Sequence, residues 1–152
     1  MLYIACDPGA SGGFAWTDSE STECAAMPPT DTDVVELLAH LSTKAKEVAI
    51  YLEEPPPFAG KLIPSSAAFK LGNNHGLILG ASIACGFKLH RVRPQAWMKA
   101  HPVGTKGDRT TTVWKNVLKA RAQELYPTVD GITLKTSDAL LILDAAVRGA
   151  IN

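Results

Sequence analysis

The segment Leu2-Tyr3-Ile4-Ala5-Cys6-Asp7-Pro8-Gly9, residues 2–9, decides which fold this sequence can adopt. Its first five residues are apolar and predict a short buried strand, and Asp-Pro-Gly predicts the turn that ends the strand. Gly12 and Gly13 then turn the chain into the apolar residues 14–16, which we expect to pair back on the first strand. The sequence therefore begins with a predicted hairpin and places a carboxylate, Asp7, where the first strand ends.

Strand and helix patterns alternate along the rest of the chain. We expect a weak third strand at 24–27, a helix that Asp31 or Thr32 can cap, and a fourth strand at 48–52. The fourth strand must stop at Glu53-Glu54-Pro55-Pro56-Pro57, because consecutive prolines cannot continue a central strand. The later predicted elements are a helix at 65–85, a strand at 87–92, a short helix at 94–99, a helix from Asp108 or Thr110 to about Tyr126, and a helix at 138–150 that Ser137 can cap. This order predicts an α/β fold with a five-stranded mixed sheet flanked by helices, in one domain spanning 1–152.

The charged residues are unevenly distributed. Fifteen Lys and Arg balance fifteen Asp and Glu, and a net charge of zero argues at first against a polyanionic ligand. However, residues 1–54 contain ten acids and two bases, whereas residues 55–123 contain eleven bases and one acid. This asymmetry indicates a nucleic-acid-binding surface; the alternative is a set of solvated helix faces.

The cysteine content and the apolar segments indicate the compartment. Three cysteines, at positions 6, 24 and 85, are an odd number without C-x-x-C spacing, which supports neither a disulfide framework nor a zinc site. The N-terminus lacks a basic region before its apolar run, so we expect no signal peptide. The longest apolar stretch, 77–87, has about half the length that a bilayer requires. We therefore expect a cytoplasmic protein without a membrane partner.

Three carboxylates stand at element ends. Asp7 closes the first predicted strand, Glu53 closes the fourth, and Asp138 opens the last helix. If strands one and four are neighbours, these residues meet at one edge of the sheet, and clustered carboxylates require a cation. Oxygen-only clusters suit Mg²⁺ or Mn²⁺. The alternatives are a turn-forming Asp7, a solvated strand end at Glu53 and a helix-dipole interaction at Asp138.

Four pieces of the sequence, in this order, carry a resemblance. They are the opening strand with Asp7-Pro8-Gly9, Leu52-Glu53-Glu54, Ala68-Phe69-Lys70-Leu71-Gly72 followed by Gly76, and Asp138-Ala139-Leu140. The chain resembles RuvC-type Holliday junction resolvases of the RNase H-like superfamily, in the short form carried by bacteriophages and some bacteria. The resemblance implies an RNase H-like fold and a structure-selective endonuclease that resolves four-way DNA junctions by Mg²⁺-dependent phosphodiester hydrolysis, with paired symmetric nicks. Mn²⁺ is expected to substitute, and the implied setting is a bacterial cell or a phage-infected host.

The resemblance also implies roles for individual residues. Asp7, Glu53 and Asp138 match the metal-binding carboxylates of the family. Glu53 is preferred to Glu54 because the matching family strand ends in apolar-Glu-Gln, with the first polar residue as ligand. Lys106 matches a basic residue near the scissile phosphate, and its alternative is a solvated loop lysine.

One position departs from the family pattern. Three residues before Asp138, where the family usually has Asp or His, this chain has Lys135, and a cation cannot ligate Mg²⁺. Lys135 can instead balance the carboxylates or touch a phosphate. Three residues remain as candidates for a fourth ligand: Asp144, Glu54 and Asp130. Asp144 lies about 120° round the helix from Asp138, so pairing with Arg148 is its alternative.

The basic middle of the chain predicts the DNA-binding surface. The residues expected to contact phosphates are Lys61, Lys70, Arg91, Arg93, Lys99 and Arg109, with Lys115, Lys119 and Arg121 in the same basic segment. Phe58 is positioned to enter an unstacked base step, or else packs on its own proline-rich loop. Trp97 and Trp114 fit buried helix faces, so we expect them in the core.

A four-way junction has two-fold symmetry, so paired nicks favour a homodimer. Gly72, Gly76 and Gly80 form one helix face on which something must pack closely, either the second subunit or the sheet. Two other functions remain open. One is a general RNase H-like nuclease acting on branched DNA or an RNA–DNA hybrid, and the other is a catalytically silent junction-binding protein.

Overall fold

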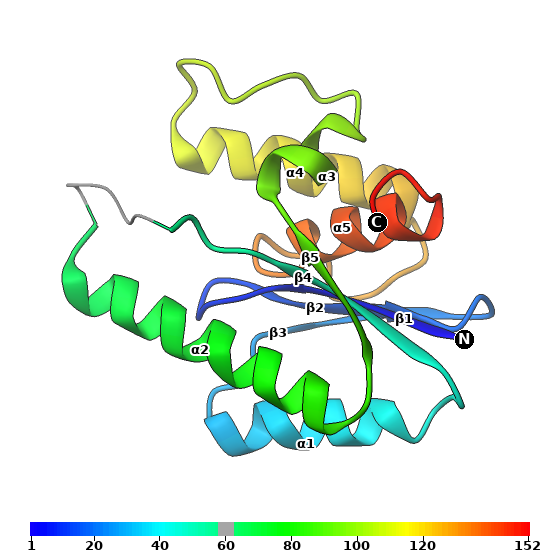
Figure 1. Cartoon of the computed structure of the whole chain (residues 1–152). Coiled ribbons are helices and arrows are strands. Elements are labelled where there is room, and N and C mark those ends of the chain that lie inside the picture. Colours follow the sequence, from blue (N-terminus) through cyan, green and yellow to red (C-terminus); the bar gives the residue numbers. More distant parts are fainter. Residues whose placement is uncertain (58–62) are drawn as a thin grey trace.

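The computed structural model describes residues 1–57 and 63–152. Five strands form one mixed sheet in the order β3-β2-β1-β4-β5, as Figure 1 shows. The strands are β1 (Leu2–Asp7), β2 (Gly13–Thr17), β3 (Thr22–Ala26), β4 (Val48–Glu53) and β5 (Lys88–Val92). The first three pair antiparallel in hairpin order, whereas β4 lies parallel to β1 and β5 parallel to β4. The predicted five-stranded mixed sheet is confirmed.

Helices cover both faces of this sheet. They are α1 (Asp31–Ser42), α2 (Ser65–Ala84), α3 (Pro94–Lys99), α4 (Thr111–Leu125) and α5 (Ser137–Val147). Figure 1 shows α1 and α2 on one face and α3, α4 and α5 on the other. No helix among residues 1–57 and 63–152 has both the length and the apolar character needed to cross a membrane.

Three predicted helix boundaries are wrong in detail. Thr30, rather than Asp31 or Thr32, caps α1, because its hydroxyl accepts the Asp33 amide hydrogen. The last helix begins at Ser137 after Thr136, so Ser137 belongs to the first turn instead of capping it. The same helix ends at Val147 and not at residue 150, since Gly149 takes a left-handed conformation with φ 69°.

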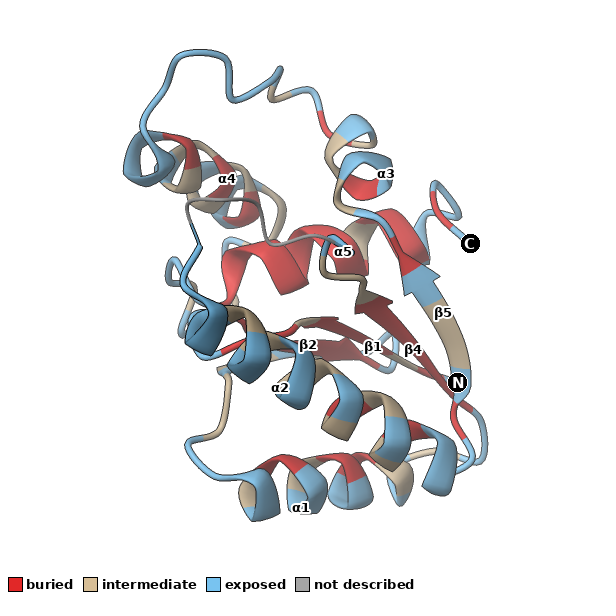
Figure 2. Ribbon diagram, turned by 60° about the vertical axis from the view of Figure 1, so that its left-hand side comes forward, coloured by how far each residue is buried: buried red, intermediate tan, exposed pale blue. Residues whose placement is uncertain are grey.

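Side-chain alternation along the strands creates two apolar layers. Ile4 and Ile50 pack toward α1 and α2, whereas Ala5, Ala15 and Ala49 pack in the layer that contains α5. Alanines leave room for a helix to lie close to the sheet, and Figure 2 shows α5 buried along most of its length. Consequently, residues in the first turn of α5 are held against the ends of the strands.

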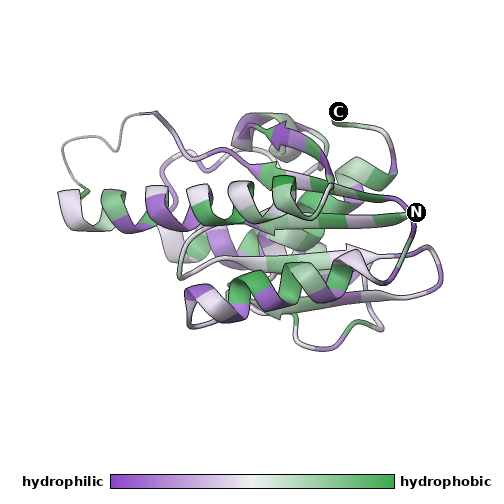
Figure 3. Ribbon diagram, turned by 60° about the horizontal axis from the view of Figure 1, so that its bottom comes forward, coloured by the Kyte–Doolittle hydropathy of each residue, from purple (hydrophilic) through white to green (hydrophobic). Residues whose placement is uncertain are grey.

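The glycine face of α2 does not pack on the sheet. A methyl group added at Gly72, Gly76 or Gly80 would meet no described atom within 4 Å. The helix instead buries Ile78 and Ser82, on its opposite side. The interpretation of the glycine row as a helix-on-sheet contact is therefore wrong, because the row faces outward from the layer of α1 and α2 seen in Figure 3.

Candidate active site at the ends of two parallel strands

Strand register brings the first two carboxylates together. In the parallel pair of β1 and β4, Cys6 lies opposite Leu52, so Asp7 and Glu53 follow directly at neighbouring strand ends. Both residues continue the alternation that places Ala5 and Tyr51 in the layer of α5. The first and fourth strands are neighbours, which is the condition that the predicted carboxylate cluster required, and Asp7 and Glu53 share one face.

The turn after Asp7 requires glycine. A side chain at Gly12 would collide with the Asp7 carbonyl oxygen and lie 3.0 Å from the carboxyl carbon Cγ. The turn is also tied to α2, because the Gly9 amide donates a hydrogen bond of 2.8 Å to Asn74 Oδ1. The Gly12 amide also donates to the Gly9 carbonyl at 3.0 Å, so hydrogen bonds within the turn and to α2 fix the backbone that follows Asp7.

A lysine from α4 completes the cluster. Lys115 Nζ donates to Asp138 Oδ2 and lies 4.0 Å from Asp7 Oδ2. The sequence alone does not place Lys115 beside the carboxylates, because it is one of eleven bases in the middle segment. The available signal was its position next to buried Trp114, at the edge of the apolar face of α4. Lys115, and not Lys135, thus supplies the positive charge beside the carboxylates. Lys135 is exposed.

Trp97 contacts the third carboxylate. Its side chain is fully buried, as predicted, and its Nε1–H donates to Glu53 Oε2 at 2.5 Å. The core assignment is therefore confirmed but incomplete. A buried indole N–H needs an acceptor, and this requirement was the signal available in the sequence.

Burial raises the pKa values of two acids in this cluster. Burial and repulsion from Asp138 raise the pKa of Asp7 to about 7, although the Lys115 ammonium lowers it. Burial and repulsion from Asp7 raise the pKa of Glu53 to about 8, against the opposing effect of the Trp97 hydrogen bond. Burial disfavours the Lys115 ammonium, but Asp138 and Asp7 outweigh that effect and raise its pKa. The cluster therefore favours added positive charge.

The donor set fits a hard divalent cation. Three carboxylates belong to this cluster: Asp138 on α5 contacts the Lys115 ammonium, Asp7 on β1 lies 4.0 Å from it, and Glu53 on β4 interacts with it electrostatically. Their oxygens are the ligand type that Mg²⁺ and Mn²⁺ prefer. As the side chains lie, no group of three or more His, Cys, Asp or Glu in the described ranges is gathered closely enough to coordinate an ion. Metal coordination would therefore require the carboxylate side chains to move closer together, around the position that the Lys115 ammonium occupies.

The candidates for a fourth ligand have other partners. Asp144 Oδ2 lies 2.6 Å from Arg148 Nη2 and 3.8 Å from His101 Nδ1, which matches the alternative of an Arg148 pair. Glu54 pairs with Arg91 at 3.5 Å. Asp130 is exposed, and its backbone carbonyl accepts from the Cys24 thiol. The carboxylates of Asp144 and Glu54 are therefore already paired with arginines.

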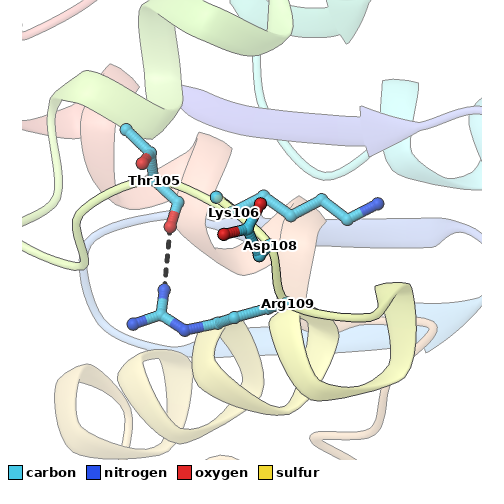
Figure 4. Close-up of a pocket in the computed structure, with 5 residues that line it drawn as sticks. Thr105, Lys106, Asp108 and Arg109 are labelled. Atoms are coloured by element: carbon cyan, nitrogen blue, oxygen red, sulfur yellow. Dashed lines mark hydrogen bonds between the residues drawn. The ribbon is translucent and has the colours of Figure 1, made fainter.

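The loop between α3 and α4 carries two of the predicted DNA-contacting bases (Figure 4). Arg109 folds back to donate to the Thr105 carbonyl at 2.8 Å, with its guanidinium 5.8 Å from the Trp114 ring centre. Lys106 extends in the other direction and donates to the Thr111 hydroxyl at 3.1 Å. Lys115, and not Lys106, is thus the lysine in contact with the carboxylates.

The other predicted DNA-binding residues are spread over the surface. Lys70 is exposed on α2 and Lys99 is exposed at the end of α3. Arg91 and Arg93 line a groove beside the end of β4, together with Glu54 and Pro55. Two further predictions, Phe58 and Lys61, fall outside the described residues.

A mixed sheet of order β3-β2-β1-β4-β5, covered by helices on both faces, is the arrangement of an RNase H-like fold. The sequence matches no protein-family model, and no curated protein sequence matches it. Among solved structures, it is similar to Thermus thermophilus RuvC in complex with Holliday junction substrate, with a TM-score of 0.65 and 14% identity over 100% of this chain and 98% of that one. A second structure of Thermus thermophilus RuvC matches with a TM-score of 0.61 and 16% identity, over 100% and 99% of the two chains. The chain has the RuvC-type resolvase fold, and the predicted fold is confirmed.

Proposed function

We propose that this protein is a metal-dependent, structure-selective endonuclease that resolves four-way DNA junctions by hydrolysis, with paired symmetric nicks. One observation carries the proposal: at the end of β1 in a RuvC-type fold, Asp7 and Asp138 lie beside the Lys115 ammonium, and Glu53 stands at the end of the neighbouring strand β4. A purely structural cluster would gain nothing from burying three acids together. Clustered acids at this place serve phosphodiester chemistry well.

In this proposal, Asp7, Glu53 and Asp138 hold Mg²⁺, and Mn²⁺ can replace it. A divalent ion held there would supply Lewis-acid chemistry, lowering the pKa of a water molecule and balancing negative charge on the departing 3′-oxygen. The chain itself provides orientation: Trp97 holds Glu53, while Gly12 and Asn74 hold the turn that carries Asp7. The site belongs to a single domain over residues 1–152, acting in the cytoplasm of a bacterial or phage-infected cell.

The substrate-binding surface is formed by the basic segment. Lys106 is proposed to lie near the scissile phosphate, and the phosphate contacts are assigned to Lys61, Lys70, Arg91, Arg93, Lys99 and Arg109. Phe58 is proposed as the apolar wedge at the crossover. These assignments are supported by the exposure of the described members and by the similarity to a RuvC structure that contains Holliday junction substrate. Phosphate contacts give affinity, whereas the shape of the junction gives selectivity.

The open face of α2 supports a homodimer. Gly72, Gly76 and Gly80 lie on one stripe of the helix, with Phe69 and Ile83 at its two ends. Phe69 is 75% and Ile83 62% exposed, which is unusual for large apolar residues on a helix that packs on one side. Glycines allow close approach of a second helix, and a two-fold axis there would supply the two active sites that paired nicks require.

The decisive experiment is a cleavage panel with wild type and Asp138→Asn. Synthetic four-way junction, linear duplex, flap and RNA–DNA hybrid are incubated with Mg²⁺, Mn²⁺ or Ca²⁺. We expect symmetric nicking of the junction by wild type with Mg²⁺ or Mn²⁺, and binding without nicking by the variant or with Ca²⁺. Preferential cleavage of the hybrid or of all branched substrates would favour a general RNase H-like nuclease, and tight junction binding without nicking under every condition would favour the silent binding protein.

A further inference from the structure

We propose that Lys115 is a resident counter-ion of the carboxylate site, which a divalent cation must displace from Asp138 in order to bind. The inference rests on the metal site of the proposed function and adds a competition between the ion and a side chain of the protein. Lys115 thereby sets how strongly the site binds metal and keeps the metal-free site folded.

The position of the Lys115 ammonium puts it in competition with a divalent cation for Asp138. Lys115 Nζ is hydrogen-bonded to Asp138 Oδ2 and lies 4.0 Å from Asp7 Oδ2, so the ammonium occupies the space between acids from α5 and β1. Mg²⁺ bonds to carboxylate oxygens at about 2.1 Å. An ion bound to Asp138 Oδ2 at that distance would use the oxygen that accepts from Lys115 and would lie in the space of the ammonium group. Both cations therefore cannot be held at once.

The Lys115 side chain can also turn toward solvent. Its side chain is 31% exposed, although that of Asp138 is only 6% exposed. A lysine has a flexible four-carbon stem and a strongly hydrated ammonium group. Rotation of this side chain toward solvent would vacate the site without any shift of α4, whose Trp114 and Leu118 are buried in the core.

The charges explain why a resident cation is useful. Without metal and without Lys115, Asp7, Glu53 and Asp138 would be buried together with no cation beside them, and such a group destabilises the fold. Lys115 reduces that repulsion from a helix that also contributes to the core. The proposal thus predicts opposite effects of one substitution: weaker metal-free stability and stronger metal binding.

The test compares Lys115→Met with Lys119→Met, which removes the same charge one helical turn further along α4. Mn²⁺ and Mg²⁺ binding are measured by calorimetry without DNA, and thermal unfolding is measured with and without Mg²⁺. We expect Lys115→Met to bind Mn²⁺ about tenfold more tightly than wild type, a size common for two ligands coupled through a shared contact. Its melting temperature should be lower than that of wild type without metal and should rise more when Mg²⁺ is added, whereas Lys119→Met should match wild type.

Equal or weaker Mn²⁺ binding by Lys115→Met would overturn the competition. If that variant does not fold, the wild-type protein provides the test: the ¹³Cε signal of Lys115, assigned with Lys115→Arg, should move when Mg²⁺ saturates the site, while that of Lys119 stays. A Lys115 signal that does not move, or a wild type and variant that both fail to bind metal, would also refute the proposal. Nicking of junctions is scored separately, so tighter metal binding by Lys115→Met in a protein that never nicks would preserve the competition and reject the proposed function.

Discussion

The indole Nε1 of Trp97 lies 2.5 Å from Oε2 of Glu53 and joins α3 to the end of β4 across 44 residues of sequence. This bond favours the ionised form of a carboxyl group whose pKa burial and Asp7 together raise to about 8. A fully buried tryptophan is rigid, so the bond also limits how Glu53 can turn. Trp97 is thus a positioning residue for the proposed metal ligand.

Replacing Trp97 with Phe keeps an aromatic ring but removes the N–H donor. We expect the free energy of unfolding to fall by about 1–3 kcal/mol, the usual cost of leaving a buried polar group without its partner. We also expect weaker Mn²⁺ binding, because Glu53 is no longer held. Urea unfolding and calorimetry measure the two effects.

Trp114→Phe is the matched control, since Trp114 is also buried but lies on α4 with Arg109 over its ring. It should lose stability through packing and leave Mn²⁺ affinity unchanged. If both variants weakened metal binding equally, the role of the indole N–H would have to be abandoned.

The raised pKa values of Asp7 and Glu53 predict a pH dependence of stability in the absence of metal. In the unfolded chain these groups lose their protons near pH 4, whereas in the folded protein they keep them until about pH 7 and pH 8. The folded state binds more protons in this interval, so these groups lower the free energy of unfolding as pH rises from about 4 to 8. Saturating Mg²⁺ should reverse the loss at pH 8.

Two histidines have the opposite effect on the pH dependence and must be separated from that of the acids. Burial lowers the pKa of His75 and of His101, so folding becomes more favourable as pH rises from their lowered folded pKa to their unfolded pKa. The measured quantity is therefore the difference in unfolding free energy between wild type and Asp7→Asn at each pH. The free energy of unfolding of wild type should fall relative to that of Asp7→Asn as pH rises. A difference that stays constant from pH 4 to 8 would contradict the raised pKa of Asp7.

The loop between α3 and α4 provides a test of DNA binding. Lys106→Ala and Arg109→Ala should each weaken junction affinity and reduce the slope of log affinity against log salt concentration by about 1, the value for one lost phosphate contact. Lys106→Ala should in addition slow nicking at saturating junction, because Lys106 is proposed to lie near the scissile phosphate. Lys44→Ala, whose lysine pairs with Glu23 at 3.8 Å, is the control and should bind like wild type.

The glycine face of α2 predicts the oligomeric state. Gly76→Gln introduces a side chain into open space in the monomer, and helix propensity favours it by up to about 1 kcal/mol. We expect a folded monomer at concentrations where wild type sediments as a dimer, with single rather than paired nicks. Ala120→Gln, on the exposed side of α4, should remain dimeric. A dimer that persists in Gly76→Gln would place the interface elsewhere.

Local patterns in the sequence were sufficient for most of the fold. Apolar runs that end at Asp7-Pro8-Gly9 and at Glu53-Glu54-Pro55 predict two strands closed by carboxylates, because turn residues and proline act on the backbone where they stand. The hairpin order of the first strands followed from the same signals, whereas the parallel pairing of the fourth strand with the first was supplied by the structure. Helix caps were less accurate, since several neighbouring polar residues can cap a helix and only the local geometry selects one.

The sequence by itself determined that three acids stand at element ends and that the middle of the chain is basic. Which groups meet those acids depended on the tertiary structure, because α3 and α4 bring Trp97 and Lys115 to Glu53 and Asp138 over 44 and 23 residues. The same holds for the glycine row of α2, whose direction depends on which side of the helix packs on the sheet. The charge of a side chain and the turn that a residue favours can be read from the residue itself. Which side chains contact each other depends on how the helices pack, and that packing cannot be read from a local sequence pattern.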